Sequence, residues 1–387
     1  MSLGRLLYFS ARSFAQLWSS WGGLLGLLLL VAYFLTVVVV SVVYPQADWD
    51  MVAYVASAMD DGSRSAAELH EAAWNAVRER VSEGEFLMLT ADRPYRVRQY
   101  ADPQAFATML GFYKVKLLYV VLTEWLSQWM QPVDALRLIS TVSAGVTGAV
   151  LVAWAARERF LDYAPFILAV VILSGVPHEA RVVIPDMLSA AFFVLGTWLY
   201  LRRLDLACAV ALFLAFLARP DTLAFLGVFA VAAVMTRQGY IMAIATFLAA
   251  LVAYFPITQA AGHPGWWIQM WFTNIEYVPT LEGFNPDFSI LVYLKMLVRV
   301  LVRSLVENTW LVLFIMELII LGRMVLGRVS MRDRELVLVC ALAAATVAKY
   351  FVAPFHGDRY YMAQLLSLGM VLIGIWSRET RKSEQPS

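Results

Sequence analysis

The feature that most constrains the fold is the first of a long series of apolar segments. Residues 21–43 contain no charged side chain, and about 20 apolar residues in a helix cross the hydrocarbon core of a bilayer. Such segments recur along the chain, because 61% of its 387 residues are hydrophobic and only 15% are charged, with a mean hydropathy of +0.68. Soluble globular chains are nearer half apolar and a quarter charged. We therefore expect an all-α polytopic membrane protein.

The N-terminal region and the cysteines narrow the class further. Arg5 and Arg12 precede the first apolar segment, which is too long for a signal peptide and has no small-residue cleavage site after it. We expect a retained first helix with its N-terminus in the cytoplasm. Cys208 and Cys340 each lie inside an apolar segment, so they predict neither a disulfide framework nor a cysteine metal site.

The placement of arginine and lysine predicts which later segments cross the membrane. Segments 106–130 and 288–306 are apolar but interrupted by charges, and Lys295, Arg299 and Arg303 recur every four residues. If both segments lie along the membrane surface, the basic linkers all fall on the cytoplasmic side, as the positive-inside rule requires. We therefore expect about ten spans with both termini cytoplasmic. The spans after the first are expected near 137–155, 162–177, 186–202, 205–218, 222–236, 239–258, 307–324, 335–352 and 360–376.

This topology also predicts the domain organisation. Residues 1–376 form a single transmembrane domain, and 45–136 is its long first outer loop, which contains amphipathic juxtamembrane helices. Residues 377–387 are expected to be a cytoplasmic tail. In the outer loop, the capping-box pattern from Ser65 to Glu68 predicts a helix that runs to about Val81.

An acidic segment stands where the first helix ends. Asp48 and Asp50 follow Pro45, which stops the helix, and Tyr44 and Trp49 suit the membrane interface. Carboxylates at a membrane surface cost desolvation energy, so they tend to face a cavity and to have a function. One function is that of a general base. A pair of carboxylates also permits Mg²⁺ or Mn²⁺ binding; we expect no obligatory metal or other cofactor and leave a divalent cation open.

Other polar residues gather in linkers that the same topology assigns to the outer side. The short spans 205–218 and 222–236 would leave their connector, Arg219-Pro220-Asp221, recessed below the membrane surface. A guanidinium there matches phosphate oxygens, although a salt bridge between Arg219 and Asp221 explains it equally well. The residues expected to bind a donor phosphate or substrate are Arg219, Arg98, Lys114, His178, Glu179, Arg181, His356, Asp358, Arg359 and Tyr360.

The order of these features resembles the GT-C superfamily of integral-membrane glycosyltransferases. Their first helix leads into a large outer loop that opens with an acidic motif. In the lipid A aminoarabinose transferases a Tyr follows four residues after the Asp, as Tyr54 follows Asp50 here. The Glu that follows the Asp in that family is absent, and Asp48 supplies a second acid upstream. Further similarities are Arg137, segment 183–187 and the Arg219-Pro220-Asp221 turn.

The resemblance implies an inverting glycosyltransferase. It would move a sugar from a polyprenyl-phosphate donor to a glycan, lipid or protein acceptor on the non-cytoplasmic face of a bacterial inner (plasma) membrane. One of the two aspartates would deprotonate the acceptor; we expect Asp50 to be this base and Asp48 to orient either Asp50 or the substrate, while cations would steady the departing lipid phosphate. The expected partners are thus the donor, the acceptor and membrane lipids, with no nucleic acid.

Two other classes of function are open to a chain of this kind. A lipid or sugar-lipid transporter or flippase would use the same cavity without chemistry, and it predicts an inverted repeat and charges near the bilayer midplane. The sequence shows no repeat, and its charges concentrate on one side. A non-catalytic scaffold would leave the outer acidic and basic clusters without a role.

Overall fold

The chain is helical throughout the part that the structure describes. The computed structural model describes residues 3–384, and the side chains of residues 17–383. Every regular element in this range is a helix, and its β pairing is limited to one isolated bridge between Gln46 and Val182. The expectation of an all-α chain is confirmed.

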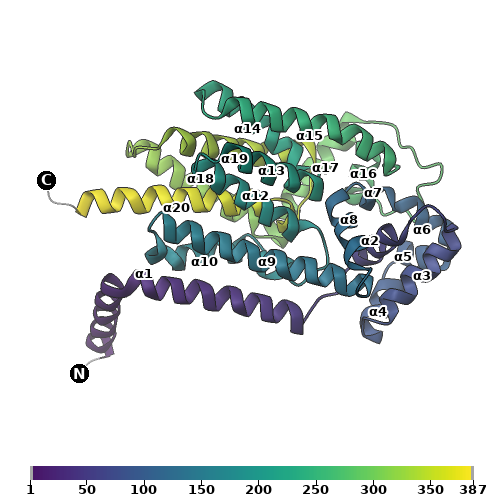
Figure 1. Cartoon of the computed structure of the whole chain (residues 1–387), viewed down its shortest axis with the longest axis horizontal. Coiled ribbons are helices and arrows are strands. Elements are labelled where there is room, and N and C mark those ends of the chain that lie inside the picture. The colour runs from purple at the N-terminus through teal and green to yellow at the C-terminus, as the bar shows by residue number, and fades with distance from the viewer. Residues whose placement is uncertain (1–2, 385–387) are drawn as a thin grey trace.

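Apolar helices run roughly along the long axis of the molecule (Figure 1). They are α1 (Leu3–Val43), α9 (Pro132–Arg157), α10 (Ala164–Leu173), α12 (Asp186–Leu201), α13 (Asp205–Ala218), α14 (Thr222–Thr236), α15 (Tyr240–Ala260), α18 (Trp310–Leu326), α19 (Asp333–Val352) and α20 (Met362–Glu384). Each expected span overlaps at least one of these helices, although span 162–177 is divided between α10 and the short helices on either side of it. Among the described residues, four helices are long and apolar enough to cross a membrane, or up to six if two bent pairs each count as one span.

Helix α12 lies at the centre of the bundle and packs against α9, α13 and α20. Its contact with α13 depends on Gly196, because a Cβ at that position would lie 2.8 Å from the side chain of Leu212. The close approach lets the two helices bury the core residues Phe193 and Leu212. A tightly packed α12–α13 pair in turn holds the connector that follows α13.

Sharp bends occur at both segments that were expected along the membrane surface, inside segment 106–130 and at the end of segment 288–306. Helices α6 (Pro103–Met109) and α7 (Gly111–Lys114) meet α8 (Leu117–Leu126) at 109°, and α17 (Ile290–Glu307) meets α18 at 88°. A right-angled turn suits a helix that leaves the bundle axis to run along its end. Whether these helices lie at a membrane surface stays a prediction.

Much of the segment expected as the first outer loop forms a helical cap at one end of the bundle (Figure 1). Besides α6 and α7 it contains α2 (Trp49–Met59), α3 (Ala66–Arg78), α4 (Glu83–Ala91) and α5 (Pro94–Ala101). The capping box at Ser65 and Glu68 is confirmed, and the helix ends at Arg78, three residues before the predicted end. Trp49, at the start of α2, is surrounded by the rings of Trp74, Tyr95 and Phe106. This buried cluster fixes α2, and with it the acidic segment, in the cap.

The basic linkers meet at the opposite end, which carries both the start of α1 and the end of α20 (Figure 1). Arg332 pairs with Glu158 at 3.4 Å, and Arg334 donates to Asp205 at 3.1 Å. The C-terminal helix joins this network because Arg381 donates to the carbonyl oxygen of Arg159. Helix α20 continues to Glu384, so the expected tail is helical as far as the structure describes it; residues 385–387 lie outside the described range.

Four helices at this end finish with a left-handed residue that is not glycine. An L-residue in this conformation costs about 1–2 kcal/mol, because its Cβ crowds the following carbonyl. The residues, which are all the non-glycine residues of positive φ in the described range, are Arg159, Arg203, Arg237 and Arg328, with φ of 63°, 60°, 56° and 53°.

Candidate functional site

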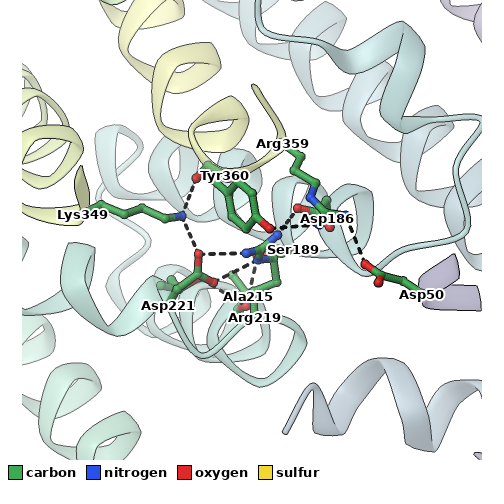
Figure 2. Close-up of polar contacts among 10 residues, drawn as sticks. Asp50, Asp186, Ser189, Ala215, Arg219, Asp221, Lys349, Arg359 and Tyr360 are labelled. Carbon is green, nitrogen blue, oxygen red and sulfur yellow. Dashed lines mark hydrogen bonds and ion pairs between the residues drawn. The ribbon is translucent and has the colours of Figure 1, made fainter. Parts of the chain in front are cut away.

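A cavity of about 520 Å³ lies where the helical cap meets the bundle. Its lining comes from α2, α5, α7, α12, α14, α15, α19 and the linkers between them, together with α16 (Trp266–Asn274). Cavities of this size accommodate small-molecule ligands when a few polar groups converge on an otherwise apolar wall. The polar groups here are described in turn, and Figure 2 draws the central ones.

The end of α1 is tied to the linker before α12, and this positions the acidic segment. The backbone N–H of Gln46 donates to the carbonyl of Arg181 at 2.9 Å. In return the Arg181 Nε donates to the carbonyl of Tyr44 at 2.8 Å. Arg181, a predicted binding residue, thus has a structural contact that brings the segment before Asp48 beside the segment before Asp186.

The two predicted catalytic carboxylates have different surroundings. Asp48 is the N-cap of α2, and its Oδ1 accepts the backbone N–H of Asp50 at 2.8 Å. Burial, and then the neighbouring charge of Asp50, raise the pKa of Asp48. Asp50 instead accepts from the Tyr113 hydroxyl at 3.0 Å and from Arg359 Nη1 at 3.3 Å. Asp50 is therefore aimed into the cavity and held from two sides, whereas Asp48 uses one oxygen to begin the helix.

Arg219 is clamped between two carboxylates (Figure 2). Its Nε and Nη2 donate to Asp221 at 2.9 and 3.0 Å, and its Nη1 donates to Asp186. Lys349 closes the network, because its Nζ contacts Asp221 at 2.6 Å and donates to the carbonyl of Tyr360. The Arg219 and Lys349 cations hold the pKa of the Asp221 carboxyl well below its usual range, although burial opposes them. The salt bridge that the sequence left open is present.

Tyr360 lies between two guanidinium groups. The Cζ atoms of Arg219 and Arg359 lie 5.0 and 4.9 Å from its ring centroid. Its hydroxyl accepts from Arg359 Nη2 at 2.9 Å. Cation–π contacts of this kind hold guanidinium groups in place without neutralising them. Tyr360 thus joins the Arg219 network to the Arg359–Asp50 pair.

Positive charge exceeds negative charge around the cavity. Six cations and four carboxylates line it, an excess of two positive charges. The cations are Arg93, Arg96, Lys116, Arg219, Lys349 and Arg359, and the carboxylates are Asp48, Asp50, Asp186 and Asp221. A cavity with this balance of charge favours an anionic ligand.

Among the six cations, Lys116 accounts best for the preference of the cavity for an anionic ligand. It donates to the carbonyl of Phe112 and lies 5.4 Å from the ring centroid of Tyr113. Among the described side chains it forms no ion pair, whereas Lys114, two residues earlier, pairs with Asp60 outside the cavity lining. The lysine expected to bind the ligand from sequence was Lys114, and the structure turns Lys116 to the cavity instead.

The remaining predicted binding residues do not line the cavity. Arg98 pairs with Asp102 at 2.6 Å and is 62% exposed, and Asp358 caps the start of α18 by accepting from the N–H groups of Thr309 and Trp310. His356 lies 3.8 Å from Glu307. The residues that line the cavity as expected are Asp48, Asp50, Arg219, Arg359 and Tyr360, and those that do not are Arg98, Lys114, His178, Glu179, Arg181, His356 and Asp358.

Glu179 does not line the cavity, but its carboxyl interacts electrostatically with the charged residues that do. It ends α11 (Val176–Glu179), its side chain is buried, and its Oε2 has no hydrogen-bond partner within the described part of the chain. Burial, and then the charge of Asp186, raise the pKa of Glu179 to about 8. A carboxyl of this kind stays protonated near neutral pH.

Sequence reasoning passed over several cavity residues. Asp221 was expected only as a salt-bridge partner of Arg219, Asp186 begins an expected span without a role of its own, and Lys349 lies inside another expected span. A lysine in an apolar helix is itself a signal, because such residues are expensive and commonly functional. For metals, no three His, Cys, Asp or Glu side chains in the described range come together as a metal site requires.

Comparisons of the chain with protein-family models, with curated proteins and with solved structures found no match.

Proposed function

We propose that the protein is a membrane glycosyltransferase of the GT-C type, which transfers a sugar from a polyprenyl-phosphate donor to an acceptor hydroxyl with inversion. The observation that carries the proposal is the pairing of Asp50 with an excess of cations in one cavity. A carboxylate can accept the proton of the acceptor. The cations can stabilise the negative charge that develops on the departing phosphate.

The residues divide these tasks between them. Asp50 takes the acceptor proton, and the acceptor oxygen forms its bond to the anomeric carbon. The bond from that carbon to the phosphate oxygen breaks, and the lipid phosphate leaves with the electron pair. Tyr113 and Arg359 orient Asp50, and Lys116 supports the phosphate because no carboxylate in the described range neutralises it.

Arg219 supports this site chiefly as a positioning residue. It uses three of its five N–H donors on Asp186 and Asp221. Two donors remain for a phosphate oxygen, but the guanidinium charge is already shared with two carboxylates. Its first role is then to hold the α13–α14 connector and the Tyr360 ring at the cavity wall.

The donor lipid would lie along α15. This helix lines the cavity with Tyr254 and Thr258, while Val252 and Phe255 are 70% and 64% exposed. An apolar outer surface next to the cavity suits a polyprenyl chain that remains among the membrane lipids while its phosphate enters the site.

The membrane arrangement that fits this function has about ten spans. The basic linkers lie at the end of the bundle opposite the cavity. By the positive-inside rule that end would face the cytoplasm, and the cavity would face the periplasmic side of a bacterial inner membrane. The donor and acceptor would meet on that outer side.

A sugar-lipid transporter is the second candidate, and one residue favours it. Glu317 is buried in the middle of α18, and neither of its carboxylate oxygens has a hydrogen-bond partner in the described range. Ionisable residues at such positions occur in transport pathways. The glycosyltransferase explains more of the cavity, because a transporter needs no base beside the anion site.

The test is to incubate the protein, purified in detergent, with radiolabelled polyprenyl-phosphate sugars and a membrane extract as the acceptor source. Transfer should give free polyprenyl phosphate and a labelled acceptor, and both products should disappear with Asp50→Asn. If no donor is consumed while vesicles containing the protein move labelled sugar lipids across their bilayer, the transporter replaces the enzyme.

A further inference from the structure

Four arginines at the end of the bundle opposite the cavity occupy a position that normally selects glycine. Each follows the last residues of a helix in a Schellman motif, in which the residue after the helix end is left-handed. In α9, the N–H of Arg159 donates to Ala156 and that of Phe160 to Ala155. Three more helices repeat the pattern through Arg203 and Leu204, Arg237 and Gln238, and Arg328 and Val329.

Backbone geometry does not account for arginine at these positions. Glycine adopts the left-handed conformation without crowding, so it would complete the same hydrogen bonds at lower cost. A favourable interaction with the helix dipole does not require this position either. An arginine of ordinary φ in the last turn serves that purpose, as Arg157 of α9 and Arg323 of α18 do. The arginine side chains therefore need a separate role.

The four side chains are exposed and lack internal partners. In the part of the chain that the structure describes, none of Arg159, Arg203, Arg237 and Arg328 makes a side-chain ion pair. At the same end Arg332, Arg334 and Arg378 are paired with carboxylates, whereas Arg157 and Arg323, in the last turns of α9 and α18, also make no ion pair within the described residues. The four left-handed arginines are thus exposed and unneutralised within the described residues, and we call this set the arginine belt.

Apolar side chains project beside three members of the belt. Leu206, Met235 and Leu326 are 79%, 80% and 81% exposed, and each lies within three residues of Arg203, Arg237 or Arg328. A single exposed apolar side chain is normal on a protein surface, but each of these three stands beside an unpaired guanidinium group. A guanidinium beside an apolar side chain suits the boundary of a bilayer, where the apolar group enters the acyl region and the guanidinium meets phosphate oxygens.

We infer that the arginine belt binds the headgroups of anionic phospholipids in the membrane leaflet at this end of the bundle. Guanidinium groups match phosphodiester oxygens in geometry and charge, and anionic lipids attract basic groups at a membrane surface. The inference is independent of the chemistry in the cavity, because the belt lies at the other end of the molecule.

The test uses the full chain in detergent, with phosphatidylglycerol or phosphatidylcholine added as the probe lipid. One variant carries Arg→Gly at all four belt positions, and a second carries Arg→Lys at all four. Phosphatidylglycerol should raise the melting temperature of the unmodified protein more than phosphatidylcholine does. The glycine variant should lose that difference, with affinity falling on the order of fivefold for each arginine removed.

The variants separate lipid binding from folding. Without lipid, the glycine variant should be as stable as the parent or more so, since glycine suits the backbone conformation; single Arg→Gly variants give the same comparison if the fourfold variant misfolds. The lysine variant should keep the phosphatidylglycerol effect. A control with Arg64→Gln and Arg78→Gln, both in the helical cap, should also keep it. A lipid effect that persists in the glycine variant would overturn the inference, as would equal stabilisation by inorganic phosphate at matched ionic strength.

Discussion

Arg359 Nη1 lies 3.3 Å from the Oδ2 atom of Asp50, although 309 positions separate the two residues in the chain. The pair joins α2, the first helix of the helical cap, to the linker before the last helix of the bundle. The contact therefore brings residues of the helical cap and residues of the bundle into a single site. Tyr113 holds the other oxygen of Asp50, so this carboxylate has a fixed orientation toward the cavity.

The first prediction concerns this carboxylate. Asn is nearly isosteric with Asp but cannot accept the proton, so Asp50→Asn should fold and lose sugar transfer by about a hundred- to ten-thousand-fold. Asp48→Asn is the matched control, because Asn also caps a helix and preserves the start of α2. Transfer from a labelled polyprenyl-phosphate sugar measures both. If Asp48→Asn is the inactive variant, the assignment within the pair is reversed.

Lys116 should act on the donor and not on the fold. Lys116→Gln removes a cation that has no carboxylate partner in the described range. The loss of one charged hydrogen bond, about 1.5–3 kcal/mol, should raise the KM for the donor by about tenfold to a hundredfold. Lys114→Gln, two residues away and outside the cavity lining, should leave that KM unchanged. Equal effects of the two substitutions would argue against a phosphate site at Lys116.

Removing Arg219 should destabilise the protein. In Arg219→Ala, Asp221 keeps Lys349 at 2.6 Å, but Asp186 loses the one ion pair that it makes in the described range. Breaking a buried pair in this way costs about 3–5 kcal/mol. Thermal unfolding in detergent should show the loss. Adding Asp186→Asn should recover most of it, and a single variant as stable as the parent would contradict the clamp.

Glu179 should make the protein less stable as the pH rises. Its carboxyl ionises near pH 4–5 in the unfolded chain, but in the folded protein it stays protonated up to about pH 8. The unfolded state therefore binds fewer protons in this window, and stability falls by up to about 1.4 kcal/mol per pH unit. Glu179→Gln should remove this slope and be the more stable protein at pH 8. Parallel pH profiles for the two proteins would show that Glu179 titrates normally.

The orientation in the membrane can be tested by labelling. The background carries Ser at Cys208 and Cys340, and single cysteines are introduced at the exposed positions Ser63 and Ser330. Ser63 lies between α2 and α3 in the helical cap, and Ser330 lies between α18 and α19 among the basic linkers at the opposite end. An impermeant thiol reagent added to intact cells should label position 63 and not position 330. Labelling at position 330 alone would place the cavity on the cytoplasmic side.

The helices could be predicted from the sequence because their signals are local. The expected spans 205–218 and 222–236 coincide with α13 and α14 to the residue. The length of an apolar run is set by consecutive residues, and the charges that mark its ends lie within a few residues of each helix end. For the same reason the capping box at Ser65 and the acidic segment at Asp48 were found without a structure. The gathering of the basic linkers at one end also followed from their order along the chain.

The site depends on contacts between distant parts of the chain, and only the tertiary structure decided those. Sequence could not choose between Lys114 and Lys116, because the chain turns by 109° between α7, which ends at Lys114, and α8, which begins at Leu117, and Lys116 lies in the break between them. Nor could it pair Arg219 with Asp186 as well as Asp221. An apolar pattern specifies which face of a helix is buried, but not which neighbour that face meets. The balance of charge in the cavity is a sum over such neighbours, so it exists only once the helices have packed.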